Sequence, residues 1–385
     1  MKRSMFVIAL SLVVTLSSVA PVVGAQEKES GERSLIQMAI LLDTSGSMSG
    51  LIQQAKTQLW KIVNQFATTK KNGQLPRLEV ALYEYGHDPL PEDKGYMRKI
   101  VPLSRDLDRV SEELFALETD GGSEYCGMVI KKATNQLDWS ESNEHLKVIF
   151  IAGNEPFTQG PVDYAKACKK AISNGVIVNT IHCGSKQDGI KGKWKDGAML
   201  ADGSFSCINQ DRAVTHVDAP QDEKIAKLNK KLNKTYIPYG GKGEAFKKRQ
   251  AEQDANAAKK AAAGAHVQRA VTKANAQYVN ANWDLVDAVE NDKVDLNEVG
   301  KTKLPEKMRN MSVKERKAYV EKNARKRAEI EKKIKKLNAE RKKYVAKKRR
   351  EKSESGEKTL GEALSDALLK QAAEKGFEKG GTENE

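Results

Sequence analysis

The amino-acid sequence predicts an α/β fold: a doubly wound, mostly parallel sheet, followed by a long-helical, coiled-coil-like C-terminal region. Between residues 34 and 239, short apolar runs alternate with amphipathic segments of helical period. Such alternation is typical of βαβ units and a parallel sheet. From Gly240 onward the composition shifts to Ala, Lys, Glu and Arg, and the apolar stripe becomes narrow. A narrow stripe on a long helix indicates a coiled-coil hairpin or a projecting helix.

The elements of the first part follow from their periodicity. Apolar runs predict buried strands at 38–42, 78–85, 146–152 and 176–183, with a short edge strand at 96–103. Apolar residues at three- and four-residue steps predict helices at 51–66, 106–117, 129–137, 162–173 and 222–236. Residues 184–211 lack a clear period and are expected to form a long loop. Residues 205–208 and 213–217 are expected to form a hairpin at the sheet edge.

The first strand ends in Asp43-Thr44-Ser45-Gly46-Ser47. A carboxylate and two hydroxyls thus occupy alternate positions of the loop that leads into the next helix. Oxygen ligands of this kind hold Mg²⁺ or Mn²⁺, with water in the remaining positions. The alternative is a Ser/Gly turn with an Asp cap, because so short a motif is weakly specific.

A DTSGS loop between a buried strand and an amphipathic helix resembles the metal-ion-dependent adhesion site of von Willebrand factor A-type domains, which have a Rossmann-like fold. The resemblance covers residues 34–239, and the stretches SEYCG, IAGNEPF and WKDGA are similar to a bacterial exported subgroup of that family. It implies that Asp43, Ser45 and Ser47 are metal ligands. It also implies that Ser123, which replaces the usual Thr of the second loop, supplies a hydroxyl.

The third metal loop departs from the family pattern. The family places an Asp directly after the central strand, and here that position is Gly153. Either Asn154 or Glu155 reaches the metal, directly or through water, or the site has one ligand fewer and binds weakly. We retain Glu155 as a candidate ligand; its alternative role is a helix N-terminal acid before Pro156.

The N-terminus has the pattern of a targeting segment. Lys2 and Arg3 precede an apolar run, and small residues lead to Ala25. We expect a signal peptide over residues 1–25, and therefore an exported protein that is periplasmic or secreted. The alternative, a membrane anchor, is disfavoured because the apolar run is short and interrupted by Ser and Thr.

Export would place the four cysteines in an oxidising compartment. Cys126 begins a helix and Cys183 ends a strand at the same predicted sheet edge, so we expect these two to form a disulfide. Cys168 lies deeper in its helix, about 9 Å below that edge. That separation is too large for a bridge to Cys183.

Trp194 lies among three lysines in the predicted loop of residues 184–211. An amphipathic aromatic side chain of this kind is enriched at protein interfaces, so Trp194 is a candidate partner-binding residue. The alternative is that Trp194 packs the loop against the domain.

The second half carries most of the charge. Residues 240–385 hold about +12 of the net charge of +14. We divide them into a linker and helical segment (240–311), a long basic helix (312–352) that opens with the capping box at Ser312, and a short helix with a disordered tail (353–385). Either these charged side chains only form a solvated face of the helix, or they bind anionic envelope polymers or lipid headgroups.

The resemblance to A-type domains implies a non-enzymatic protein-binding module in which an acidic residue of the partner completes the coordination of the metal. The alternative is a structural envelope protein that binds anionic polymers or lipid through its basic helix and has a degenerate metal site. A hydrolase is disfavoured because His182 and Cys183 are strand neighbours and point to opposite faces. Nucleic acid is not an expected partner, since no base-reading motif is present.

Overall fold

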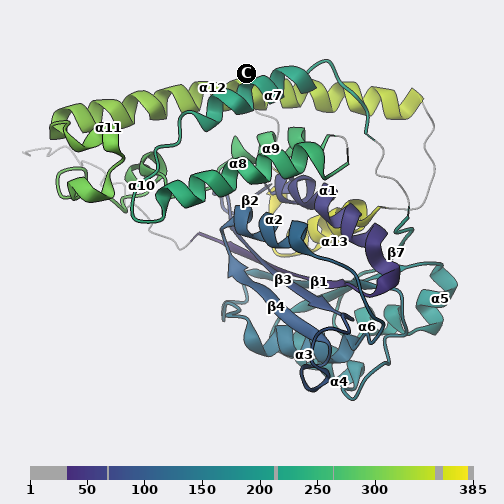
Figure 1. Cartoon of the computed structure of the whole chain (residues 1–385). Helices are drawn as coiled ribbons and strands as arrows, with labels where there is room; N and C mark the ends of the chain where they lie inside the picture. Colours follow the sequence, from purple (N-terminus) through teal and green to yellow (C-terminus); the bar gives the residue numbers. More distant parts are fainter. Residues whose placement is uncertain (1–32, 67–68, 212–215, 263, 352–358, 380–385) are drawn as a thin grey trace, which may run out of the picture. The chain divides into compact units, whose positions relative to one another are not determined.

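The computed structural model describes residues 33–379, apart from 67–68, 212–215, 263 and 352–358. Within them a six-stranded sheet has the order β4-β3-β1-β5-β6-β7 (Figure 1). Only the β3–β4 pair is antiparallel among the neighbouring pairs of this sheet. The strands are β1 (Leu35–Asp43), β3 (Arg77–Tyr85), β4 (Met97–Ser104), β5 (Leu146–Gly153), β6 (Ile177–Cys183) and β7 (Phe205–Ile208). The predicted doubly wound, mostly parallel sheet is confirmed.

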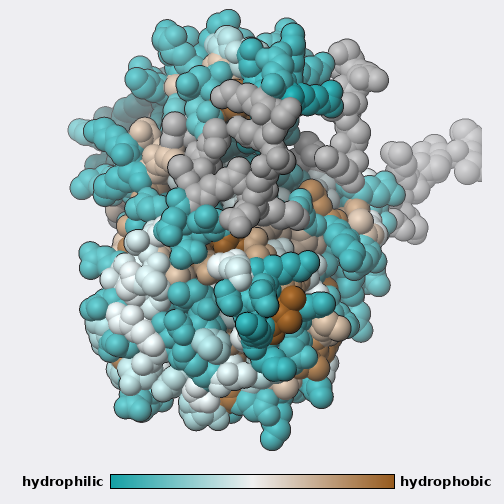
Figure 2. Space-filling model, turned by 90° about the vertical axis from the view of Figure 1, so that its right-hand side faces the viewer, coloured by the Kyte–Doolittle hydropathy of each residue, from teal (hydrophilic) through white to brown (hydrophobic). Residues whose placement is uncertain are grey.

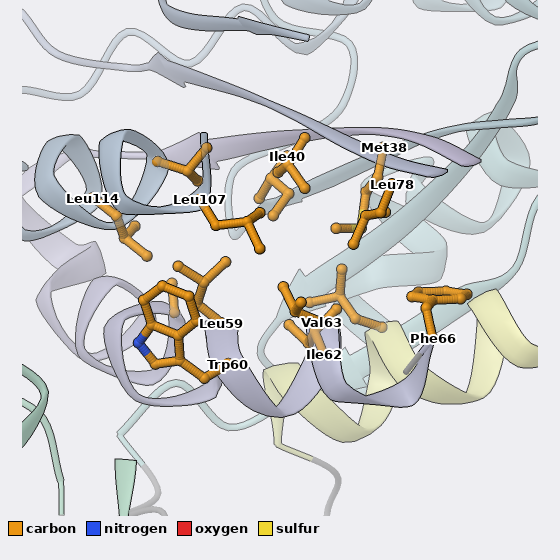
Figure 3. Packing of buried hydrophobic residues seen from close by; sticks show 14 of the residues in the cluster. Met38, Ile40, Leu59, Trp60, Ile62, Val63, Phe66, Leu78, Leu107 and Leu114 are labelled. Atoms are coloured by element: carbon orange, nitrogen blue, oxygen red, sulfur yellow. The ribbon is translucent and has the colours of Figure 1, made fainter. Parts of the chain in front are cut away.

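Both faces of the sheet are covered by helices, which explains why the central strands β1 and β5 are mostly apolar and are buried along their whole length. One face packs against α1 (Ser49–Gln65), α2 (Leu107–Ala116) and α13 (Leu360–Glu374). The other packs against α3 (Cys126–Gln136), α4 (Tyr164–Ser173) and α6 (Trp194–Met199). Figure 3 shows the first face, where Met38 and Ile40 of β1 lie against Leu59 and Ile62 of α1.

The segment after β6 is not the structureless loop that the sequence predicts. It forms two short helices, α5 (Lys186–Lys191) and α6, and then β7. The strand expected at 205–208 is present as β7 at the sheet edge and pairs in parallel with β6. Most of the other expected arm of the hairpin, 213–217, lies outside the described residues, so the hairpin stays a prediction. Helices of six residues make fewer than two turns, so they show too little apolar periodicity to be recognised.

The long basic helix is present as α12 (Val313–Glu351). It follows five shorter helices: α7 (Asp222–Asn233), α8 (Gly243–Lys259), α9 (Ala265–Lys273), α10 (Leu285–Glu290) and α11 (Glu306–Arg309). Its buried seam lies against α7, α9 and α10, and Ile330 and Ile334 join the apolar cluster that lines the sheet. The arginines that interrupt the seam, Arg327 and Arg341, pair with carboxylates of other elements.

The last helix and the residues after it belong to the sheet domain. Helix α13 is amphipathic, and its apolar side, including Leu364 and Leu368, is buried against α1 and strands β5 to β7. Beyond it, β8 (Glu378–Lys379) pairs with β2 (Thr69–Lys70). The predicted disordered tail is therefore wrong up to Lys379, and residues 380–385 lie outside the described part.

The predicted signal peptide, residues 1–25, also lies outside the described residues. No helix among residues 33–379, in the parts described, is both long and apolar enough to cross a bilayer.

Candidate metal-binding site

Asp43 is the last residue of β1 and lies at the carboxyl end of the central strands. Its side chain is fully buried. Oδ1 accepts a hydrogen bond from the Ser45 backbone N–H at 2.8 Å. Oδ2 is buried and accepts none from any group in the described part of the chain. A buried carboxylate oxygen without a donor is costly, and a bound cation would remove that cost.

The loop hydroxyls lie beside this carboxylate. Ser45 is buried and Ser47 is exposed, with 3.4 Å between their Oγ atoms. The Gly46 N–H donates to the Gly121 carbonyl at 3.0 Å, which joins the first loop to the second. Asn154 Nδ2 donates to Ser47 Oγ at 3.2 Å, which joins the third loop. Three loops that are distant in sequence therefore meet at one point.

Glu124 is a site residue that the sequence analysis missed. It lies directly after the Gly-Gly-Ser turn of the second loop and is buried. Its carboxylate lies close enough to the Ser45 hydroxyl for that hydroxyl to lower its pKa, and close enough to Asp43 for the two charges to repel. Its Oε2 also lacks a hydrogen-bond partner among the described residues. An acid immediately after a glycine turn at the sheet edge is the sequence signal that could have identified it.

Gly153 has no room for the acid that the family pattern places there. A Cβ at this position would lie 2.5 Å from Tyr85 Oη and 2.7 Å from Asp43 Oδ2. Tyr85 is held there because its hydroxyl donates to the Ala152 carbonyl at 2.9 Å. The departure at the third loop is thus coupled to a tyrosine at the end of β3.

Burial controls the charge of both acids. Desolvation raises the pKa of Asp43 to about 7, the Ser45 N–H opposes the rise, and the charge of Glu124 adds to it. Desolvation also raises the pKa of Glu124. Both carboxylates would ionise more readily beside a cation.

The donor set fits a hard divalent cation. Asp43 Oδ2, Glu124 Oε2 and Asn154 Oδ1 are buried oxygens without hydrogen-bond donors in the described residues, and the hydroxyls of Ser45 and Ser47 adjoin them. An all-oxygen set of this kind suits Mg²⁺ or Mn²⁺.

Two residues of the predicted ligand set make other contacts. Ser123 lies close enough to the Tyr96 hydroxyl to oppose the rise in the pKa of that phenol, and Glu155 accepts a hydrogen bond from Gln159 Nε2 at 3.4 Å. Asp43, Ser45 and Ser47 lie together as the sequence indicates, whereas Glu124 and Asn154 join them through the tertiary structure.

Trp194 is not a partner-binding residue, which corrects the expectation from its sequence context. Its side chain is 0% exposed and lies against Phe157, with 4.8 Å between ring centroids. Its Nε1–H donates to the Glu155 carbonyl at 2.8 Å. The alternative holds: Trp194 packs its segment onto the domain and supports the third loop.

The predicted disulfide between Cys126 and Cys183 is wrong, and both are free thiols. They share an edge of the sheet but lie on opposite faces, Cys126 in the apolar layer under α3 and Cys183 in the layer under α1. Burial raises the pKa of the Cys183 thiol well above its usual value. It would therefore be a poor nucleophile.

The raised pKa of Asp43 makes stability depend on pH. Between about pH 4 and 7 the folded protein holds a proton on Asp43 that the unfolded chain has released, so stability should fall as pH rises through this window. We expect Asp43→Asn to increase the free energy of unfolding at pH 7.5 in EDTA and to have little effect at pH 4. One pKa unit corresponds to about 1.4 kcal/mol. Urea denaturation at both pH values would measure this difference. A variant that is less stable than wild type at pH 7.5 would contradict the prediction.

Residues 37–191 match the family model of the von Willebrand factor type A domain. No curated protein matches the sequence.

Three solved structures illustrate the structural similarities. Proximal thread matrix protein 1 from the mussel byssus, solved with zinc in its MIDAS motif, is 15% identical with a TM-score of 0.36, and the match covers 47% of this chain and 43% of that one. The SpRpn10 VWA domain is 20% identical with a TM-score of 0.34, and the match covers 45% of this chain and 85% of that one. BatB from Bacteroides thetaiotaomicron is 13% identical with a TM-score of 0.35, covering 57% and 98%. The match thus spans less than half the length of the mussel protein.

Proposed function

Because this chain contains a von Willebrand factor type A domain at residues 37–191, we propose that it is an exported, non-enzymatic module that binds a protein partner through a divalent cation. Such domains commonly mediate protein–protein binding at a metal-dependent site. The cation, Mg²⁺ or Mn²⁺, is held by Asp43, Ser45 and Ser47. Glu124 supplies the acid that has no room at Gly153. The export part of the proposal rests on the signal-peptide pattern of residues 1–25.

The observation that carries this proposal is the convergence of buried oxygens without donors, on Asp43, Glu124 and Asn154, beside two loop hydroxyls. Mg²⁺ usually retains several waters. Ser123 and Glu155 are left to contact the ion through such water. Ser47 is exposed, so the ion would face solvent on that side. An acidic side chain of the partner would replace one water there and complete the coordination.

Metal affinity tests the ligand set. Calorimetric titration with Mn²⁺ and with Mg²⁺ should show no binding to Asp43→Ala, because the one carboxylate of the DTSGS loop is lost. Binding to Glu124→Gln should be at least ten-fold weaker, since an amide oxygen carries no charge for the ion. Glu92→Gln removes an exposed acid from a neighbouring loop and should bind like wild type.

Equal affinity of wild type and Asp43→Ala would refute the site. Equal affinity of wild type and Glu124→Gln would remove Glu124 from it.

A second function is supported by the charge of α12. The helix carries 18 lysines and arginines and six acids. Its net positive charge therefore equals that of residues 240–385 as a whole. Most of these cations are exposed, and the face seen in Figure 2 is largely hydrophilic. The helix could therefore bind anionic envelope polymers or lipid headgroups while the A-type domain selects the partner.

Binding of the full chain to isolated cell envelopes separates the two functions. Loss of binding in EDTA, reversed by Mn²⁺ and absent in Asp43→Ala, would support the metal-dependent contact. Binding that is unchanged by EDTA but weakens as the salt concentration rises would support a contact through α12. Exposed charges are screened over about 8 Å at physiological salt.

A further inference from the structure

A second group of metal-ligating side chains lies away from the DTSGS loop, where the chain enters α7. Two carboxylate oxygens lie close to one imidazole nitrogen there. His216 Nε2 lies 3.1 Å from Asp222 Oδ2 and 3.3 Å from Asp218 Oδ1, and the three ligand atoms lie within 4.8 Å of one another.

An ion pair alone explains this arrangement poorly. An imidazole nitrogen has one N–H direction and can aim it at one acceptor. The second carboxylate then has no directed bond to that nitrogen. A cation on the nitrogen lone pair would contact all three atoms. With Zn–N and Zn–O bonds of about 2.0–2.2 Å, ligand atoms of a tetrahedral site lie about 3.3–3.6 Å apart, close to the two distances observed.

The surrounding residues hold two of the three ligands in place. Arg341 of α12 donates to Asp222 Oδ1 at 2.5 Å, so the carboxylate presents Oδ2 to His216. The His216 ring lies on the backbone of Gly264, where an added Cβ would be 2.1 Å from Nδ1. Gly264 has φ of +87°, a conformation that favours glycine. Partners of this kind orient the ligands of natural metal sites.

We propose that His216, Asp218 and Asp222 bind Zn²⁺, with water in the fourth position. An imidazole in the set favours zinc over Mg²⁺ or Ca²⁺, which prefer oxygen ligands. The ion joins the segment before α7 to helix α7, which Arg341 connects to α12. It therefore fixes the point where the chain passes from the sheet to the helical region, and it stabilises the folded state by binding it in preference to the unfolded chain. This site is independent of the proposed cation site at Asp43.

The test uses the full chain with Asp43→Ala, so that the first site does not contribute. Zn²⁺ is titrated in competition with a chromophoric chelator, and Co²⁺ is used to detect tetrahedral coordination by its visible absorption. The Asp43→Ala protein should bind one Zn²⁺. Adding Asp218→Asn should weaken binding at least ten-fold; because the Asp218 side chain is 100% exposed, this change should leave the fold intact.

The matched control is Glu223→Gln, which removes an exposed acid from the first turn of the same helix. It should leave Zn²⁺ affinity unchanged. The proposal is overturned if the Asp43→Ala protein binds no Zn²⁺, if Asp218→Asn binds as tightly as its parent, or if Glu223→Gln weakens binding as much. The last result would mean that only general negative charge attracts the ion.

Discussion

Removal of α13 is expected to unfold the sheet domain, although this helix follows the last strand of the sheet by about 150 residues. Its apolar side closes one face of the sheet: Leu360 and Leu364 line a space of about 10 Å³ with residues of β1, α1 and α2. The Leu360 N–H donates to Gln54 Oε1 at 2.8 Å. Gln371 and Asn179 of β6 exchange side-chain hydrogen bonds of 2.7 and 3.0 Å. A chain that ends at Glu351 would expose all of these groups to water.

Single variants should show a graded effect. Leu368→Ala leaves a cavity at a fully buried position and should lower the free energy of unfolding by about 2–5 kcal/mol. Lys370→Ala is the control, because this lysine is exposed in the same helix and pairs with Glu374 at 3.9 Å. It should change stability by less than about 0.5 kcal/mol.

Urea denaturation followed by circular dichroism would measure these variants, and a synthetic peptide of residues 359–379 should restore structure to the truncated chain. If the truncated chain unfolds at the same urea concentration as the full chain, α13 is not part of the cooperative unit.

Arg327→Met is expected to be nearly as damaging. Arg327 is a buried arginine of α12 that forms ion pairs with two acids at the start of α10. Its Nη1 lies 2.8 Å from Asp284 Oδ2 and 2.5 Å from Asp287 Oδ1. Its Nη2 donates to the Thr235 carbonyl at 3.0 Å, and its guanidinium lies over the ring of Tyr236. Removing one partner of a buried ion pair leaves the other charge uncompensated, at a cost of about 3–5 kcal/mol.

The matched control for this variant is Arg325→Met. Arg325 is exposed on the same helix and pairs with Glu321 one turn away. Exposed pairs of this kind contribute about 0.3–0.5 kcal/mol. Thermal unfolding of both variants gives the comparison. Similar losses of stability in the two would mean that the buried ion pairs do not hold α12 to the α10 segment.

The fold could be predicted to a large extent because its evidence is local. The continuous apolar run of β1 and the three- and four-residue steps of α1 are properties of short segments. Each pattern can be read from neighbouring positions, although the strands and helices it predicts are completed by contacts with distant segments. The DTSGS loop is also a local pattern, and its Asp43, Ser45 and Ser47 lie together as expected. The limits of α12 follow from a local capping box and an unbroken helical seam.

What the sequence could not determine depends on contacts between distant segments. Glu124 reaches Asp43 only because the second loop folds over the first. Position 153 has no room for a side chain because Tyr85, from another strand, occupies that space. Cys126 and Cys183 share an edge but are separated by the sheet. Trp194 has a solvated sequence context, yet its ring is buried by Phe157.

The same distinction explains α13, which packs on the sheet rather than remaining a surface appendage. By itself the sequence determined the longer strands and helices, the charge of α12 and the principal loop of the candidate metal site, but not the short helices α5 and α6. The tertiary structure alone decided which acid accompanies Asp43, which cysteines can meet and which helices complete the core. The physical reason is that burial, which sets the pKa of Asp43 and the environment of Trp194, is a property of the assembled chain and is absent from any short segment of it.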